Sequence, residues 1–272
     1  MHNITTDVSD YTFQRMLRLK DQQGYGLSDW SEWFTYLVQD VHIQDSWQEI
    51  IQQNTRKNML QIWAVNLAEN MPDIRSGHMI RDLVPEAANS NPRLITGPAI
   101  VVGRGPSMFK HRHLELLAEK GFKGLIIATD GALRECLDRG VTPHYSVSVD
   151  GNREKIKLWY EHPEMAERIA KTGYPKAILC TTVAHNVTTT CQKANMEIFW
   201  FHPMFDDFRR NDSFTKIQML MTSTDVYENG AASVTAGGNA GTTAWVLAHQ
   251  CLYRSPIGLI GLDMGYLPET PI

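Results

Sequence analysis

After residue 92, short apolar runs alternate with amphipathic stretches, and this alternation constrains the fold of the 272-residue chain more than any other feature. Between the runs lie helical patterns, of which Leu114, Leu117 and Ala118 form one example. Apolar strands that alternate with helices are typical of a parallel sheet covered on both faces. The sequence therefore predicts an α/β, Rossmann-like fold with a mostly parallel sheet, whose strands are Ala99–Val102, Leu125–Ala128, Tyr145–Val149, Ala177–Cys180, Ile198–Phe201 and Ile257–Ile260.

The first ninety or so residues have a helical pattern instead. Apolar residues fall on one face of a helix at Trp30, Trp33, Phe34, Leu37, Val38 and Val41. A second helix is predicted through Leu60, Trp63 and Leu67. Aromatic stripes at this spacing are typical of a packed core, so we assign no chemistry to them. Helix breakers between Pro85 and Pro92 predict a boundary, which divides the chain into a helical segment (1–92) and a Rossmann-like domain (93–272).

Charge and composition exclude several classes of protein. The 26 basic and 30 acidic residues give a net charge of −4, which disfavours a nucleic-acid partner. The four cysteines are scattered, as expected of a protein in a reducing cytoplasm. Residues 229–253 carry no charge, but their first half is small and polar and their second half contains His249 and Gln250. We therefore expect a cytoplasmic protein that does not enter the membrane.

The first strand of the predicted domain leads into a glycine-containing loop, with Gly103, Gly105, Pro106 and Ser107 ahead of a helix. Glycines allow the backbone to approach an anion closely, and a helix N-terminus offers free N–H groups. A phosphate site is one interpretation of the loop, although it matches neither GxGxxG nor a Walker A sequence. The alternative is an ordinary strand-to-helix turn.

Three aspartates, Asp130, Asp150 and Asp263, follow strands of the predicted sheet. Each has a glycine beside it or two residues before it. The carboxyl ends of parallel strands share one edge of a sheet, where ligands bind in α/β proteins. Carboxylates there are suited to Mg²⁺ carried by a nucleotide, which makes Asp130 and Asp150 candidate metal ligands, or to ribose hydroxyls. The alternative for each is that it only caps the next helix.

A second loop of small residues contains Gly237, Gly238 and Asn239 and leads into a predicted helix at Ala244–Leu252. A second helix start at the same edge indicates a large ligand, such as a nucleotide that carries another group. The alternative is close packing of helix on strand, which also selects small residues. We expect one cleft to be lined by Ser107, Asp130, Asp150, Asn239 and Asp263.

Two histidines, His185 and His202, follow the fourth and fifth predicted strands and are candidate general bases, since imidazole titrates near neutral pH. A histidine in a loop is, however, more often a bystander than a catalyst. Hydrolase and protease functions are disfavoured, because the sequence has no GxSxG or HExxH motif.

Five motifs in order resemble the MptE-like superfamily: Ala99–Ser107 (AIVVGRGPS), Ala128–Ala132 (ATDGA), Gly140–Asp150 (GVTPHYSVSVD), Ser233–Ala248 and Ile260–Tyr266 (IGLDMGY). This superfamily includes archaeal 6-hydroxymethylpterin diphosphokinases and bacterial motility accessory factors, which are implicated in flagellin glycosylation. The Gly-Pro-Ser loop and the late Gly-Leu-Asp also resemble bacterial sialyltransferases that use CMP-sugars. The resemblance covers the chain from about Pro92 onward.

The resemblance implies two chemistries. The diphosphokinases carry an Asp-x-Asp element that holds Mg²⁺ and ATP phosphates, whereas this chain has Ser148 in place of the first aspartate and Asp150 in place of the second. The loss of one carboxylate favours the glycosyltransferase branch. We therefore expect a nucleotide-dependent transferase that binds a nucleotide or nucleotide-sugar and a small hydroxyl acceptor, with Mg²⁺ as an optional cofactor. The alternatives are a diphosphokinase and a nucleotide-binding module without activity. The sequence does not predict an oligomeric state.

Overall fold

The computed structural model describes residues 57–263 and 265, apart from 92, 161–163, 173–174, 207, 210, 212 and 236–237. The predicted helix around Trp30–Val41 and the predicted site residue Gly237 lie outside this range, as does Pro92. A compact unit begins at Met59. The predicted division into 1–92 and 93–272 remains a prediction.

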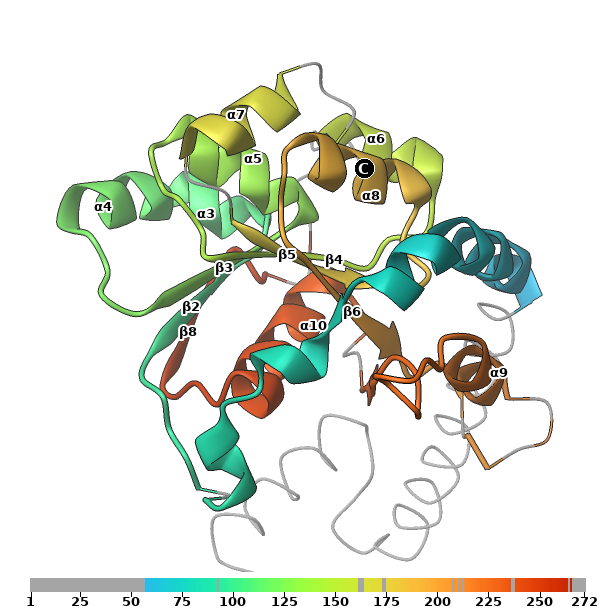
Figure 1. Ribbon diagram of the computed structural model, residues 1–272. Helices are drawn as coiled ribbons and strands as arrows, with labels where there is room; N and C mark the ends of the chain where they lie inside the picture. The colour runs from blue at the N-terminus through green and yellow to red at the C-terminus, as the bar shows by residue number, and fades with distance from the viewer. Residues whose placement is uncertain are drawn as a thin grey trace, which may run out of the picture. The chain divides into compact units, whose positions relative to one another are not determined.

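A parallel sheet forms the centre of this unit (Figure 1). Its strand order is β1-β6-β5-β4-β3-β2-β8, and β7 pairs with β6 outside this path. All of these pairings are parallel, with Val101 of β2 aligned to Ile127 of β3 and to Leu259 of β8. The prediction of a parallel α/β sheet is confirmed. The strands are β1 (His78–Met79), β2 (Ala99–Val102), β3 (Leu125–Thr129), β4 (Tyr145–Ser148), β5 (Lys176–Cys180), β6 (Ile198–Pro203), β7 (Ser233–Val234) and β8 (Ile257–Ile260).

Helices cover both faces of the sheet, as its apolar strands require (Figure 1). One face carries α3 (Pro106–Lys110), α4 (His113–Lys120), α5 (Asp130–Asp138), α6 (Arg153–Tyr160), α7 (Met165–Thr172) and α8 (His185–Lys193). The opposite face carries α10 (Ala240–Val246), which continues as a π-helical turn at Leu247–Cys251. The remaining helical elements are residues 57–76, two 3-10 turns at Ile80–Leu83 and Glu86–Asn89, and α9 (Phe214–Met221).

The core lies between the sheet and these two helical layers. All five residues of β3 are buried, because the strand is central and has helices on both sides. In contrast, β8 lies at the edge of the sheet, and Leu259 in it is 54% exposed. Within the described part of the chain, no helix is both long and apolar enough to cross a membrane.

Candidate functional site at the carboxyl edge of the sheet

The predicted site residues follow the carboxyl ends of neighbouring strands. Gly103, Asp130, Asp150 and Asp263 come after β2, β3, β4 and β8, which are adjacent in the order β4-β3-β2-β8. Because these strands are parallel, all four residues lie toward the same edge of the sheet. The structure brings them together in two groups, one around Asp263 and one around Asp130.

In the first group, Asp263 binds the start of α3. The backbone N–H of Ser107 donates to Asp263 Oδ2 at 2.6 Å, and the N–H of Gly105 donates to the carbonyl of Gly261 at 2.8 Å. A Cβ atom on Gly105 would lie 2.5 Å from Asp263 Oδ2 and 2.7 Å from the Gly261 carbonyl oxygen. Glycine is therefore required here by the close approach of two loops. The predicted phosphate position at the helix start holds a carboxylate of the protein itself.

The second group joins Asp130 to Ser148 and Asp150. Asp130 is the first residue of α5 and is only 8% exposed, while Ser148 at the end of β4 is fully buried. Asp130 Oδ1 and Ser148 Oγ both lack a hydrogen-bond partner among the described residues. Burial raises the pKa of Asp130 to about 7; the Asp150 charge adds to this shift, and the Ser148 hydroxyl opposes it. A carboxyl group that titrates near neutral pH is able both to accept and to donate a proton.

Polar residues extend this second group into the protein. The hydroxyls of Ser146 and Tyr160 lie 3.1 Å apart, and both residues are buried. Burial raises the pKa of Tyr160 well above its usual range, and the nearby Asp130 adds to the shift, so the phenol stays protonated. Ser146 and Tyr160 were not predicted as site residues from the sequence. The available signal was the pair of serines at alternate positions of β4, which places two small hydroxyls on one face of a buried strand.

The backbone around Asp150 is held by several hydrogen bonds. Asp150 Oδ1 accepts from the Asn152 N–H at 2.7 Å, and the Asp150 carbonyl accepts from the Ala184 N–H at 3.1 Å. The next carbonyl, that of Gly151, accepts from the side chain of Asn66 at 2.9 Å. Asn66 belongs to the helical segment 57–76, for which no chemistry was predicted from the sequence.

Asn239 caps α10. Its Oδ1 accepts from the Thr242 N–H at 2.9 Å, and its own N–H donates to Thr242 Oγ1 at 3.3 Å. A Cβ on Gly241 would lie 3.0 Å from Leu262, which shows close packing of the kind that also selects small residues. Asn239 and Gly238 are exposed. Their predicted role in ligand binding remains a prediction.

The two histidines have structural partners. His185 begins α8, and its Nδ1 lies 2.8 Å from Asn70 Oδ1. His202 is fully buried in β6, with Nδ1 2.7 Å from Thr181 Oγ1. Burial lowers the pKa of His202 to about 3, so its ring is neutral at physiological pH. Complete burial keeps this ring from an acceptor at the surface, and the geometry therefore disfavours His202 as a general base.

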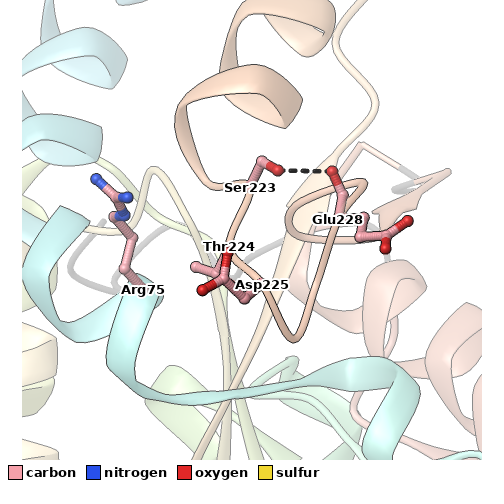
Figure 2. Close-up of a pocket in the computed structure, with 5 residues that line it drawn as sticks. All are labelled: Arg75, Ser223, Thr224, Asp225 and Glu228. Carbon is pink, nitrogen blue, oxygen red and sulfur yellow. Dashed lines mark hydrogen bonds between the residues drawn. The ribbon is translucent and has the colours of Figure 1, made fainter.

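The described residues contain no cluster of three or more His, Cys, Asp or Glu side chains suited to a metal ion. They do form an open hollow of about 620 Å³ lined by Arg75, Ser223, Thr224, Asp225 and Glu228 (Figure 2). Ser223 Oγ donates to the Glu228 carbonyl within the segment 223–228, which lines one part of this hollow. None of these residues belongs to either group at the carboxyl edge, so we do not assign the hollow to the predicted site.

The family model for 6-hydroxymethylpterin diphosphokinase MptE-like proteins matches residues 65–269. The chain belongs to the MptE-like family. The matched range includes every strand of the sheet and both groups of edge residues. Membership of a family with this description supports a transferase-like function.

A search of solved structures found similarity to the MAf glycosyltransferase from Magnetospirillum magneticum AMB-1, with a TM-score of 0.49 and 18% sequence identity. The match covers 78% of this chain but 29% of that protein, so the MptE-like chain spans less than a third of its length. No curated protein sequence matched the chain.

Proposed function

We propose that this MptE-like protein is a nucleotide-dependent transferase whose substrates bind at the carboxyl edge of the sheet. The observation that carries the proposal is the buried Asp130 carboxyl beside Ser148 and Asp150. Asp130 Oδ1 and Ser148 Oγ have no hydrogen-bond partner among the described residues. Buried polar atoms are usually hydrogen-bonded, and those that are not often mark a ligand or water position. We favour glycosyl transfer from a nucleotide-sugar of the CMP-sugar type, since Ser148 replaces an expected metal-binding aspartate.

In this proposal Asp130 is the general base. The acceptor hydroxyl attacks the anomeric carbon of the donor sugar, and its proton passes to the Asp130 carboxylate. The bond between the sugar and the phosphate oxygen breaks, and the nucleoside monophosphate leaves with the electron pair. A pKa of about 7 suits this role, because general acid–base catalysis works best when the pKa lies near the working pH. Asp130 takes this role in place of His202 because Asp130 keeps 8% exposure and has a pKa of about 7, whereas His202 is fully buried and its pKa is lowered to about 3.

The nucleotide is expected to contact the two helix starts. Gly103, Gly105, Pro106 and Ser107 face the donor phosphate, and Gly238 and Asn239 face the remainder of the nucleotide. Because Asp263 accepts the Ser107 N–H bond in this structure, a phosphate must displace that carboxylate to use the same donor.

The second candidate is a Mg²⁺- and ATP-dependent diphosphokinase that acts on a hydroxymethyl pterin, and the description of the family favours it. Asp130 and Asp150 would hold the metal together with ATP phosphates, which is a common way to bind Mg²⁺. The unpartnered Asp130 Oδ1 fits such a ligand. The metal would neutralise phosphate charge as the hydroxymethyl group attacks. Only one of the two Asp-x-Asp carboxylates is present, however, so we expect Mg²⁺ alone to bind weakly.

A thermal-shift panel with CMP, CDP, UDP, ADP and ATP, each with and without Mg²⁺, tests the proposal. A ligand at 100 times its Kd stabilises a protein by about 2.7 kcal/mol. We expect a cytidine or uridine nucleotide to stabilise the protein at least as well as ATP, and Mg²⁺ alone to have little effect. Strict dependence on Mg²⁺, preference for ATP and release of AMP with a hydroxymethyl pterin would establish the diphosphokinase instead. A nucleotide that stabilises the protein but is not consumed with any acceptor would indicate a nucleotide-binding module without activity.

A further inference from the structure

Two buried asparagines join the helix at 57–76 to the carboxyl edge of the sheet. Asn66 and Asn70 are one helical turn apart and are 7% and 0% exposed. Their side chains bind backbone carbonyls in the loops that follow β4 and β5. Trp63, one turn earlier, stacks on Phe205 with ring centroids 3.8 Å apart. The helix is therefore fixed against the loops after three neighbouring strands.

The two asparagines act on different loops. Asn66 Nδ2 donates to the carbonyls of Gly151 and Thr182, both at 2.9 Å, and so ties the loop after β4 to the loop after β5. Asn70 contacts only the β5 side among the bonds that the structure shows. Its Nδ2 donates to the carbonyls of Val183 at 2.8 Å and Thr181 at 3.4 Å. Its Oδ1 accepts from Thr188 Oγ1 at 2.9 Å and lies 2.8 Å from Nδ1 of the candidate site residue His185.

The Asn66 bond lies directly beside a predicted site residue. Gly151 follows Asp150, whose own carbonyl is held by the Ala184 N–H. Two consecutive carbonyls are thus fixed by donors from separate elements, and the orientation of Asp150 depends on both. A Cβ on Gly151 would lie 3.1 Å from Asn66 Nδ2 and 3.0 Å from the Thr182 carbonyl oxygen, which shows how closely these parts approach.

We propose that Asn66 is a positioning residue for the nucleotide site, because it fixes the backbone that carries Asp150. This inference rests on the proposed function. It assigns to the helix at 57–76 a part in ligand binding, through a hydrogen bond to the loop and not through contact with the ligand. Loss of the Asn66 amide would then weaken nucleotide binding even in a variant that remains folded.

The test compares Asn66→Ala with Asn70→Ala in the full chain. Each variant removes buried hydrogen bonds from the same helix, but only the first removes a direct bond to the loop that carries Asp150. The Kd for CMP and for ATP with Mg²⁺ is measured by titration calorimetry, and stability is measured by urea unfolding. We expect Asn66→Ala to weaken the binding of whichever nucleotide the wild type binds by about tenfold to a hundredfold, as is typical when a supporting shell is removed. Asn70→Ala should lose as much stability or more, with a smaller loss of affinity.

A milder variant keeps the test valid if Asn66→Ala fails to fold. Asn66→Gln retains the amide donor on a longer side chain, and we expect its affinity to lie between those of the wild type and the alanine variant. Equal losses of affinity in the position 66 and position 70 variants would overturn the proposal, as would unchanged binding by a folded position 66 variant. If the wild type binds neither CMP nor ATP with Mg²⁺, the proposed function fails first. If it binds one of them and the position 66 variants bind equally well, only the role of Asn66 is lost.

Discussion

The Asp263 carboxylate accepts a hydrogen bond from the backbone N–H of Ser107 at 2.6 Å. This contact joins the loop after β8 to the start of α3, two segments that are far apart in sequence. A negative side chain at a helix start is favoured by the unpaired N–H groups there. The same N–H group was expected to hold a ligand phosphate, so Asp263 and the phosphate would compete for it.

Replacement of Asp263 by Asn should strengthen CMP binding by about fivefold, because removal of a unit charge about 4 Å from a phosphate is worth roughly 1 kcal/mol in water. The amide oxygen remains able to accept the Ser107 N–H bond, so the change isolates the charge. Calorimetric titration of the wild type and the variant measures the effect. Weaker binding by the variant would instead indicate that the Asp263 carboxylate accepts hydrogen bonds from the ribose hydroxyls.

Replacement of Gly105 by Ala should destabilise the protein by about 1–3 kcal/mol, which is usual for overpacking. The new Cβ would lie 2.7 Å from the Gly261 carbonyl oxygen, and backbone must move to relieve that contact. Gly258→Ala is the matched control, since its Cβ would meet no atom nearer than 3.6 Å. Urea unfolding of both variants should show a large loss only at position 105, and equal losses would contradict the packing explanation.

Asp130 should make the stability of the protein depend on pH. Burial raises its folded pKa from 3.8 to about 7, so between these values the folded state binds more protons than the unfolded state. The contribution of Asp130 to stability therefore falls as pH rises from about 4 to about 7, by roughly 4 kcal/mol in full at about 1.4 kcal/mol per unit. Asp130→Asn removes this dependence. The free energies of unfolding of the two proteins, measured with urea from pH 4 to 8, should diverge as the pH changes. Parallel plots of this free energy against pH would show that the pKa of Asp130 is not raised in the folded state.

His202 should act in the opposite direction. Its folded pKa is lowered from 6.5 to about 3, so the unfolded state binds more protons between these values. The contribution of neutral His202 to stability is complete above pH 6.5 and is lost as pH falls, by roughly 2 kcal/mol at pH 5. Relative to the wild type, His202→Gln should therefore gain roughly 2 kcal/mol in the free energy of unfolding between pH 7.5 and pH 5. A difference between the two proteins that does not change over this range would show that the ring is protonated in the folded state.

The sheet was predictable from sequence because each buried parallel strand is a short apolar run, and all six predicted runs coincide with strands. Asp130, Asp150 and Asp263 were predictable as edge residues for the same reason, since each comes after such a run. Partners far apart in the sequence were not predictable. Nothing in the local pattern indicates that Asn66 reaches Gly151 or that Asp263 reaches Ser107, because these contacts depend on how the helices pack.

The glycines also show the limit of local motifs. A glycine that permits a phosphate to approach and a glycine that permits a second loop to approach have the same sequence pattern. At Gly105 the structure shows the second case, because the loop after β8 lies so close that an added Cβ would be 2.7 Å from the Gly261 carbonyl oxygen. The burial of His202 was likewise not predictable, since a histidine directly after an apolar run can lie either in the protein interior or at the exposed edge of the sheet.

Hydrogen exchange of the wild-type protein with and without saturating CMP tests the central claim most directly, because it reports both binding and its location. We predict slower exchange in the backbone amides of Ser107, Asp130 and Gly151 and their neighbours, at the carboxyl edge of the sheet. The hollow around Ser223–Glu228 should be unchanged. Protection confined to that hollow, or no protection anywhere with CMP or with ATP and Mg²⁺, would contradict a nucleotide site at this edge.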